Sequence, residues 1–147
     1  MSDRRLRLSA LVLALAGIGV AAYLTYVHYA GLQPLCAGGS HGCERVQSSS
    51  YAKVGGIPVA VLGLAGYVAI AVALVLPGER ARLAAAALAV SGFGFSAYLT
   101  YLELFDIRAI CQWCVASAVI LTLLCVLTVW RLVVDDEGWP ATADHRR

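Results

Sequence analysis

Four uncharged stretches of about 20 residues constrain this chain more than any other feature of its sequence. A helix that crosses the hydrocarbon core of a bilayer, roughly 30 Å thick, needs about 20 residues. Only 14% of the 147 residues are charged and 61% are hydrophobic, so the chain lacks the charge that normally covers a soluble domain. Charged residues or histidine bound the four stretches, which are residues 8–27, 58–76, 83–102 and 109–130.

The sequence therefore predicts an all-α membrane protein, a four-transmembrane-helix bundle with a long extracytoplasmic loop between its first two helices. We expect one domain over residues 1–147 and a polar cytoplasmic tail over residues 133–147. A cleaved signal peptide is the alternative for the first stretch, but the run is long and no convincing cleavage site follows before Tyr29. The expected helices cover about residues 8–28, 58–76, 83–104 and 110–132.

The distribution of basic residues predicts the orientation of the bundle. If the chain crosses the membrane four times, the N-terminus, the turn at residues 77–82 and the C-terminal tail lie on one side. Eight of the eleven basic residues lie in these three segments. Because cytoplasmic segments are enriched in Lys and Arg, both termini are expected in the cytoplasm. A net charge of +2 without a basic cluster gives no sign of a nucleic-acid partner. The eight residues are Arg4, Arg5, Arg7, Arg80, Arg82, Arg131, Arg146 and Arg147.

An internal repeat relates the two halves of the chain. The segment from Gly17 to Tyr26 reappears as Gly92 to Tyr101, and the same offset of 75 residues carries Cys36 onto Cys111. Shared helix-packing residues alone also explain the similar segments, since small residues permit close helix approach and Thr forms hydrogen bonds between helices. A duplication explains the aligned cysteines as well, and it predicts that the cysteines lie together at the outer end of one bundle.

Four of the five cysteines form two pairs that suggest thiol chemistry. Cys111 and Cys114 form a Cys-X-X-Cys motif at the start of the fourth helix, where free backbone amides and the helix dipole favour a thiolate. Cys36 and Cys43 flank a glycine-rich segment that we expect to be flexible enough to exchange with a neighbouring disulfide and with a soluble partner. The fifth, Cys125, is interpreted as a small packing residue.

Two other interpretations of the four paired cysteines remain open. They are a structural zinc site, which the wide Cys36 to Cys43 spacing disfavours, and two inert disulfides. The sequence does not predict which sulfurs are joined at rest. His28 and Glu103 occupy equivalent places in the repeat, and either is a candidate proton donor, although solvation at the membrane interface explains both more simply.

The sequence resembles the bacterial homologues of the vitamin K epoxide reductase (VKOR) family over about residues 8–132. The resemblance rests on the Cys36/Cys43 loop pair, the segment from Cys43 to Ser50, the Gly-Ile-Pro entry into the second helix at residues 56–58, and Cys111-Gln-Trp-Cys114. It implies a VKOR-like membrane domain in the bacterial cytoplasmic membrane. Its implied activity is quinone-dependent oxidation of a separate thioredoxin-fold, DsbA-like protein, which supports disulfide formation in exported proteins.

The resemblance also implies roles for individual residues. Cys111 and Cys114 are similar in position to the family's catalytic pair, with Cys114 nearer the quinone, and Cys36 and Cys43 to its shuttle pair. Ser49 falls where the family has a serine that hydrogen-bonds the quinone. The resemblance implies menaquinone or ubiquinone as this quinone, and no metal or flavin is expected. Its neighbours Ser48 and Ser50 are alternatives, and a polar loop or helix cap explains all three serines equally well.

Departures from the family narrow the expected activity. Some members continue into a thioredoxin-like domain, whereas this chain has about a dozen polar residues after the fourth helix, so we expect a separate partner. Ala118 replaces the tyrosine of the animal vitamin K reductases, which makes epoxide reduction doubtful. The DsbB family performs similar chemistry but carries its Cys-X-X-Cys in the first outer loop. A non-catalytic four-helix membrane protein with structural disulfides or zinc is the remaining alternative.

Overall fold

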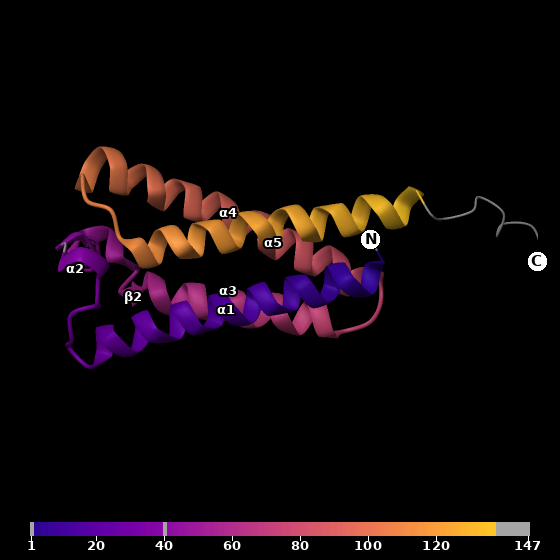
Figure 1. The fold of residues 1–147 in the computed structure, drawn as a ribbon, viewed down its shortest axis with the longest axis horizontal. Coiled ribbons are helices and arrows are strands. Elements are labelled where there is room, and N and C mark those ends of the chain that lie inside the picture. Colours follow the sequence, from indigo (N-terminus) through magenta and orange to yellow (C-terminus); the bar gives the residue numbers. More distant parts are fainter. Residues whose placement is uncertain (1, 40, 138–147) are drawn as a thin grey trace, which may run out of the picture.

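Four long helices dominate the computed structural model, which describes residues 2–39 and 41–137 (Figure 1). Three of them are long and apolar enough to cross a membrane, and α3, with 17 residues, lies at the short end of the range for spanning helices. The predicted all-α membrane bundle is therefore confirmed. The helices are α1 (Asp3–Tyr29), α3 (Val59–Val75), α4 (Glu79–Leu102) and α5 (Gln112–Glu137).

Three of these helices extend beyond the uncharged stretches of the sequence. Helix α1 begins five residues earlier than the first stretch, α4 begins at Glu79, and α5 continues to Glu137. Charged residues limit how far a helix enters hydrocarbon, but Arg, Lys and Glu are good helix formers and do not end the helix itself. The first five residues of the predicted tail are thus helical, and residues 138–147 lie outside the described residues.

The helices form a closed ring in which each contacts two neighbours. Helix α1 packs against α3 and α5, and α4 packs against the same two helices, so α1 and α4 lie diagonally opposite each other. The N-terminus, the turn between α3 and α4 and the C-terminal part of α5 lie at one end of this ring (Figure 1). The cysteine-bearing segments lie at the other end, which we call the cysteine end. The basic residues described in the structure therefore divide between the two ends as the sequence predicts.

The long segment between α1 and α3 is more ordered than a flexible loop. It contains a 3₁₀ turn, η1 (Ala37–Gly39), the short helix α2 (Gly42–Ser48) and a second turn, η2 (Ser50–Ala52). Strands β1 (Lys53–Val54) and β2 (Ile57–Pro58) then form an antiparallel hairpin. Gly55 and Gly56 join them with φ values of 59° and 85°, which glycine adopts without steric cost in a tight hairpin turn.

Of the repeated glycines, Gly17 and Gly92 allow close packing of equivalent helix pairs, whereas Gly19 and Gly94 face open space. A side chain on Gly17 would collide with the ring of Tyr67 in α3, and one on Gly92 would approach Leu121 in α5 to 3.0 Å. The repeated threonines behave differently from the expectation, because each hydroxyl donates to the carbonyl four residues earlier in its own helix. The glycines, and not the threonines, therefore account for the contact between helices.

Candidate active site

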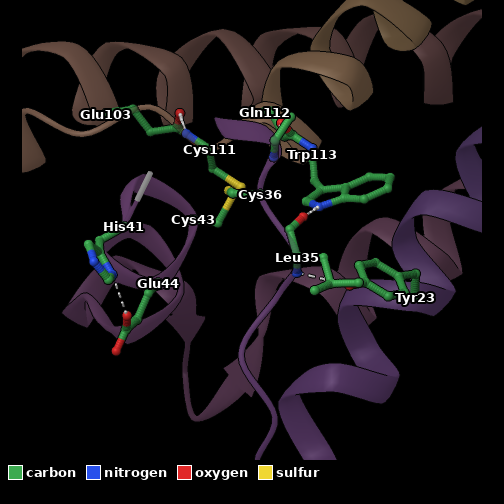
Figure 2. The surroundings of a disulfide bond; sticks show 11 residues. Tyr23, Leu35, Cys36, His41, Cys43, Glu44, Glu103, Cys111, Gln112 and Trp113 are labelled. Atoms are coloured by element: carbon green, nitrogen blue, oxygen red, sulfur yellow. Dashed lines mark hydrogen bonds and ion pairs between the residues drawn. A yellow bond between two sulfur atoms is a disulfide. The ribbon is translucent and has the colours of Figure 1, made fainter. Parts of the chain in front are cut away.

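The two cysteine pairs lie next to each other at the cysteine end. Cys36 and Cys43 form a disulfide, with their Cα atoms 6.3 Å apart, whereas Cys111 and Cys114 are free thiols. Cys43 and Cys111 are 1% and 0% exposed and belong to one buried cluster with Val46. The side chain of Cys111 points toward the disulfide (Figure 2). The structure thus brings together the four cysteines that the repeat predicts to be neighbours.

A glycine lets α2 approach the segment that leads into α5. A Cβ atom on Gly42 would collide with the carbonyl oxygen of Ile110, so any other residue would push α2 away. Gly42 immediately precedes Cys43, and Ile110 immediately precedes Cys111. This close backbone approach therefore positions the buried disulfide sulfur beside the buried thiol.

The two residues between Cys111 and Cys114 hold the disulfide loop in place. Trp113 donates its indole N–H to the carbonyl of Leu35 at 2.8 Å, and the Gln112 side chain accepts the backbone N–H of Ala37 at 2.9 Å. Tyr23 accepts the backbone N–H of Leu35 at 3.0 Å and packs its ring 4.9 Å from that of Trp113 (Figure 2). We call Tyr23, Gln112 and Trp113 the loop clamp. It restrains a segment that the sequence predicts to be flexible.

The position of Cys111 at the start of α5 favours its thiolate. The thiol of Cys114 hydrogen-bonds to the Cys111 sulfur, and the backbone N–H groups of Cys114 and Trp113 add to this effect; together they lower the pKa of Cys111 to about 7 despite its burial. Cys111 is therefore more readily ionised than a free cysteine. This agrees with the sequence argument that a helix N-terminus favours a thiolate.

A cavity of about 190 Å³ lies between the four helices and opens onto Cys114. Cys111 is not among the residues that line it, so the two thiols of the motif face different surroundings. Most of the lining side chains are apolar, as in typical pockets for organic ligands. Tyr67 forms part of the wall and its hydroxyl lies 2.7 Å from that of Ser117. The polar or titratable lining residues are Gln47, Ser49, Tyr51, Tyr67, Ser96, Thr100, Glu103, Cys114 and Ser117.

Of the three predicted serines, only Ser49 lines the cavity. Its hydroxyl donates to the carbonyl of Val46 at 2.7 Å, just after α2, and therefore caps the end of this helix. Ser48 and Ser50 are exposed, and Ser48 donates to the carbonyl of Arg45. A serine hydroxyl that donates to a carbonyl still accepts a hydrogen bond through its oxygen.

Glu103 is part of the site, although the sequence favours an interfacial role for it. Its side chain is 5% exposed, lines the cavity and accepts the backbone N–H of Cys111 at 3.3 Å (Figure 2). It begins a π-helical turn, η3 (Glu103–Ile107), which ends at Arg108 in the left-handed region with a φ of 51°. His28, its counterpart in the repeat, is half-buried and packs edge-on against Tyr29, away from the cavity.

The arrangement of the titratable groups bears on the zinc alternative. The described residues contain no group of three or more His, Cys, Asp or Glu side chains arranged to hold an ion. Cys36 and Cys43 are joined to each other and do not offer thiolates in this structure. Cys125 lies within α5, away from the two pairs, and is a free thiol, which fits its interpretation as a packing residue.

These features define the class of protein to which the chain belongs. A membrane helix bundle that holds a disulfide beside one buried thiol and one half-buried thiol that faces an apolar cavity is a membrane thiol oxidoreductase. The family model described as the vitamin K epoxide reductase (VKOR) family matches residues 8–129, which include all four cysteines of the site. The chain belongs to the VKOR family.

Proposed function

We propose that this protein is a thiol:quinone oxidoreductase that re-oxidises a separate, extracytoplasmic thioredoxin-fold protein of the DsbA type. The observation that carries the proposal is the continuous series of sulfur atoms from the half-buried Cys36 through Cys43 and Cys111 to the cavity at Cys114. Such a series leads from the surface of the bundle to a membrane cavity. It supports transfer of electrons between a protein thiol and a lipid-soluble acceptor.

The burial of the sulfurs suggests the order of exchange. A thiolate of the reduced partner attacks Cys36, the more exposed sulfur, and releases Cys43 as a thiolate beside Cys111. The partner's second thiol then frees Cys36 and leaves the partner oxidised. Cys43 attacks Cys111 of an oxidised Cys111–Cys114 pair, and Cys36 finally attacks Cys43. This restores the loop disulfide and leaves two thiols, which is the state of the present structure.

The cavity suits a quinone as the electron-accepting substrate. Its apolar lining matches a fused or substituted ring, while Ser49 and Glu103 offer polar atoms for a carbonyl oxygen. Two electrons and two protons leave the thiols of Cys111 and Cys114 as their disulfide forms, which is the stoichiometry of reduction of a quinone to a quinol. Cys114 is the thiol that faces this substrate.

We further propose that the protein lies in a bacterial cytoplasmic membrane with both termini in the cytoplasm and the cysteine end outside. The division of basic residues between the two ends supports this orientation. A reporter enzyme that works only in the cytoplasm should be active when fused after Arg147. Activity only with a reporter that requires export would contradict the orientation.

Turnover with purified components tests the oxidoreductase. The protein in detergent, supplied with a reduced thioredoxin-fold protein and a short-chain menaquinone or ubiquinone, should produce quinol and oxidised partner in equal amounts. Cys114→Ala should abolish this turnover. Cys125→Ala, which removes a thiol of the same helix outside the site, should not change it.

Two results would contradict the proposal. One is absence of turnover by the unmodified protein with either quinone, and the other is undiminished turnover by Cys114→Ala. Stoichiometric zinc in the purified protein would instead favour a structural metal site. A fully retained fold with no exchange between the loop disulfide and any thioredoxin-fold protein would favour a structural role for that disulfide.

A further inference from the structure

Glu103 is held firmly in place beside the thiols. Its backbone carbonyl accepts the N–H groups of Arg108 and Ala109, the latter at 3.1 Å, and its carboxylate accepts the N–H of Cys111. The backbone carbonyl and the carboxylate of Glu103 thus both bind N–H groups of the segment that leads into α5. The wide π turn permits this arrangement by directing the carboxylate toward the bundle interior.

The same carboxylate shares the cavity with the thiol of Cys114. Glu103 and Cys114 both line the cavity, and Glu103 accepts the backbone N–H of Cys111, three residues before Cys114. No Lys, Arg or His is among the described residues that line it. Buried carboxylates are normally paired with a cation, and an ionisable group at membrane depth without one indicates a functional role.

The chemistry at Cys114 requires a path for protons. A thiol must lose its proton before its sulfur reacts with an acceptor, and a quinone that gains electrons must gain protons. Cys114 faces a cavity whose lining is mostly apolar. The cavity-lining groups that titrate, besides Cys114 itself, are Glu103, Tyr51 and Tyr67, and only a carboxylate is an effective proton acceptor near neutral pH.

We propose that Glu103 is the proton carrier of this site: it accepts the proton that Cys114 releases and donates it to an oxygen of the reduced quinone. This inference rests on the proposed quinone reduction. It makes Glu103 a catalytic residue that shares the cavity with the reacting sulfur of Cys114 and with the quinone. The equivalent position in the first half of the repeat, His28, takes no part.

The step balances over one turnover. The thiols of Cys111 and Cys114 lose two electrons and two protons, and a disulfide bond forms between their sulfurs. The quinone gains both electrons and both protons and becomes a quinol. Glu103 carries the protons one after the other and ends the cycle as a carboxylate.

The groups around Glu103 define what a pH profile would report. They are Cys111 just before α5, Cys114 in α5, Tyr51 from η2, Tyr67 from α3 and Asp106 from the same turn. Helix α2 contributes no titratable side chain to the cavity. The hydrogen bond between Tyr51 and Asp106 raises the pKa of Tyr51, so this phenol stays protonated at neutral pH.

Replacement of Glu103 separates proton transfer from structural support. Glu103→Gln retains a carbonyl oxygen that accepts the Cys111 N–H but cannot carry a proton. We expect its rate of quinone reduction to fall about 100-fold, a typical contribution of one acid–base group. The wild-type dependence of this rate on Glu103 ionisation should also disappear from the pH profile. Glu103→Asp should recover part of the rate and the pH dependence, and His28→Gln should match the wild type.

The rate of exchange between the partner protein and the loop disulfide serves as the test of folding. It does not involve Glu103, so Glu103→Gln should retain it together with the Cys36–Cys43 bond. Quinone reduction by Glu103→Gln within threefold of the wild type, with an unchanged pH profile, would overturn the proposal. Equal losses in both half-reactions would also overturn it, since they would indicate a purely structural role.

Infrared difference spectroscopy tests the proton carrier without a quinone. Chemical conversion of the Cys111/Cys114 thiols to their disulfide should change the carboxyl signal, and the change should be absent in Glu103→Gln but present in Asp106→Asn. Failure of the wild-type protein to reduce any quinone, with this signal intact, would defeat the proposed function while leaving the proton coupling of Glu103 in place. A difference spectrum without a Glu103 signal would overturn the proton carrier itself.

Discussion

The two halves of the repeat share a helical frame but differ where they meet the cysteine end. In the first half, Cys36 follows α1 in a long segment and is part of a disulfide. In the second half, Cys111 follows α4 after a single π turn and is a buried thiol. Equivalent helices thus support two different cysteine environments. The difference shows that the segments that follow the repeated helices α1 and α4 place the two cysteines in different surroundings.

The polar residues at equivalent positions differ in the same way. Glu103 is turned into the bundle by the π turn, whereas His28 continues the regular helix α1 and packs against Tyr29. A change of backbone geometry over one turn therefore places Glu103 in the cavity, whereas His28 at the equivalent position lies outside it. The following four predictions test how far the two halves have diverged.

Loss of the repeated cysteines should give the largest effect and should separate the two halves. Cys111→Ala removes the partner of Cys114, so we expect quinone reduction to fall by about 10³-fold or more, even in a single turnover of fully reduced protein. Cys36→Ala should block turnover driven by the partner protein but retain quinone reduction after chemical reduction of Cys111 and Cys114. Equal single-turnover rates in the two variants would show that the halves are functionally equivalent.

Weakening the loop clamp should give a moderate effect on exchange alone. Trp113→Phe keeps an aromatic ring but removes the N–H that binds Leu35, and a hydrogen bond of this kind contributes about 1 kcal/mol. We expect the rate of exchange with the partner protein to change by about fivefold to tenfold, with quinone reduction by pre-reduced protein unchanged. Trp130→Phe, on the exposed surface of α5, is the matched control. An effect on quinone reduction alone would contradict the assigned role of Trp113.

The ionisation of Cys111 should depend on Cys114. In a Cys36→Ala/Cys43→Ala background, the thiolate absorbance of Cys111 should appear as the pH rises through about 7. The folded-state pKa lies below the value of a free cysteine, so this contribution to stability is present at high pH and is lost as pH falls through about 7. Cys114→Ala should raise the pKa of Cys111, because the thiol of Cys114 makes the largest contribution to its lowering. If the pKa of Cys111 is unchanged in Cys114→Ala, the backbone N–H groups at the start of α5 alone account for its lowering.

The repeated glycines should give the smallest effect on turnover and an unequal effect on stability. Gly17→Ala places a methyl group against the ring of Tyr67, which cannot bend aside, so we expect a loss of about 1–3 kcal/mol in unfolding free energy. Gly92→Ala meets only the end of the Leu121 side chain and should cost less. Denaturant unfolding in detergent measures both. A larger loss for Gly92→Ala would mean that the α4–α5 packing is the less adaptable one.

Much of the fold follows from the sequence because the signals are local. Long uncharged runs predict the helices, and the repeat with its aligned cysteines predicts where the two pairs meet. The prediction of a flexible segment between Cys36 and Cys43 is less successful, because its order depends on Trp113 and Gln112, some 75 residues away. Hydrogen bonds between distant segments leave no periodic pattern in a sequence.

The role of Glu103 is the part of the site that the sequence indicates least clearly. Its equivalence to His28 suggests a common place at the membrane interface, and nothing in the residue types signals a π turn. The burial of Glu103 depends on the π turn and on the segment before α5, whose Cys111 N–H binds the carboxylate. The sequence gives one indication that Glu103 lies near the thiols, which is its position only eight residues before Cys111.

The complete burial of Cys111 has a consequence for which reductants the protein accepts. Thiol–disulfide exchange requires the attacking sulfur to reach the sulfur under attack. Small thiols in solution can reach the half-buried Cys36. They cannot reach Cys111, because α2 and the clamped loop cover it. In the proposed reaction, electrons then enter through the loop disulfide, and small reductants have no direct route to Cys111 or to the quinone.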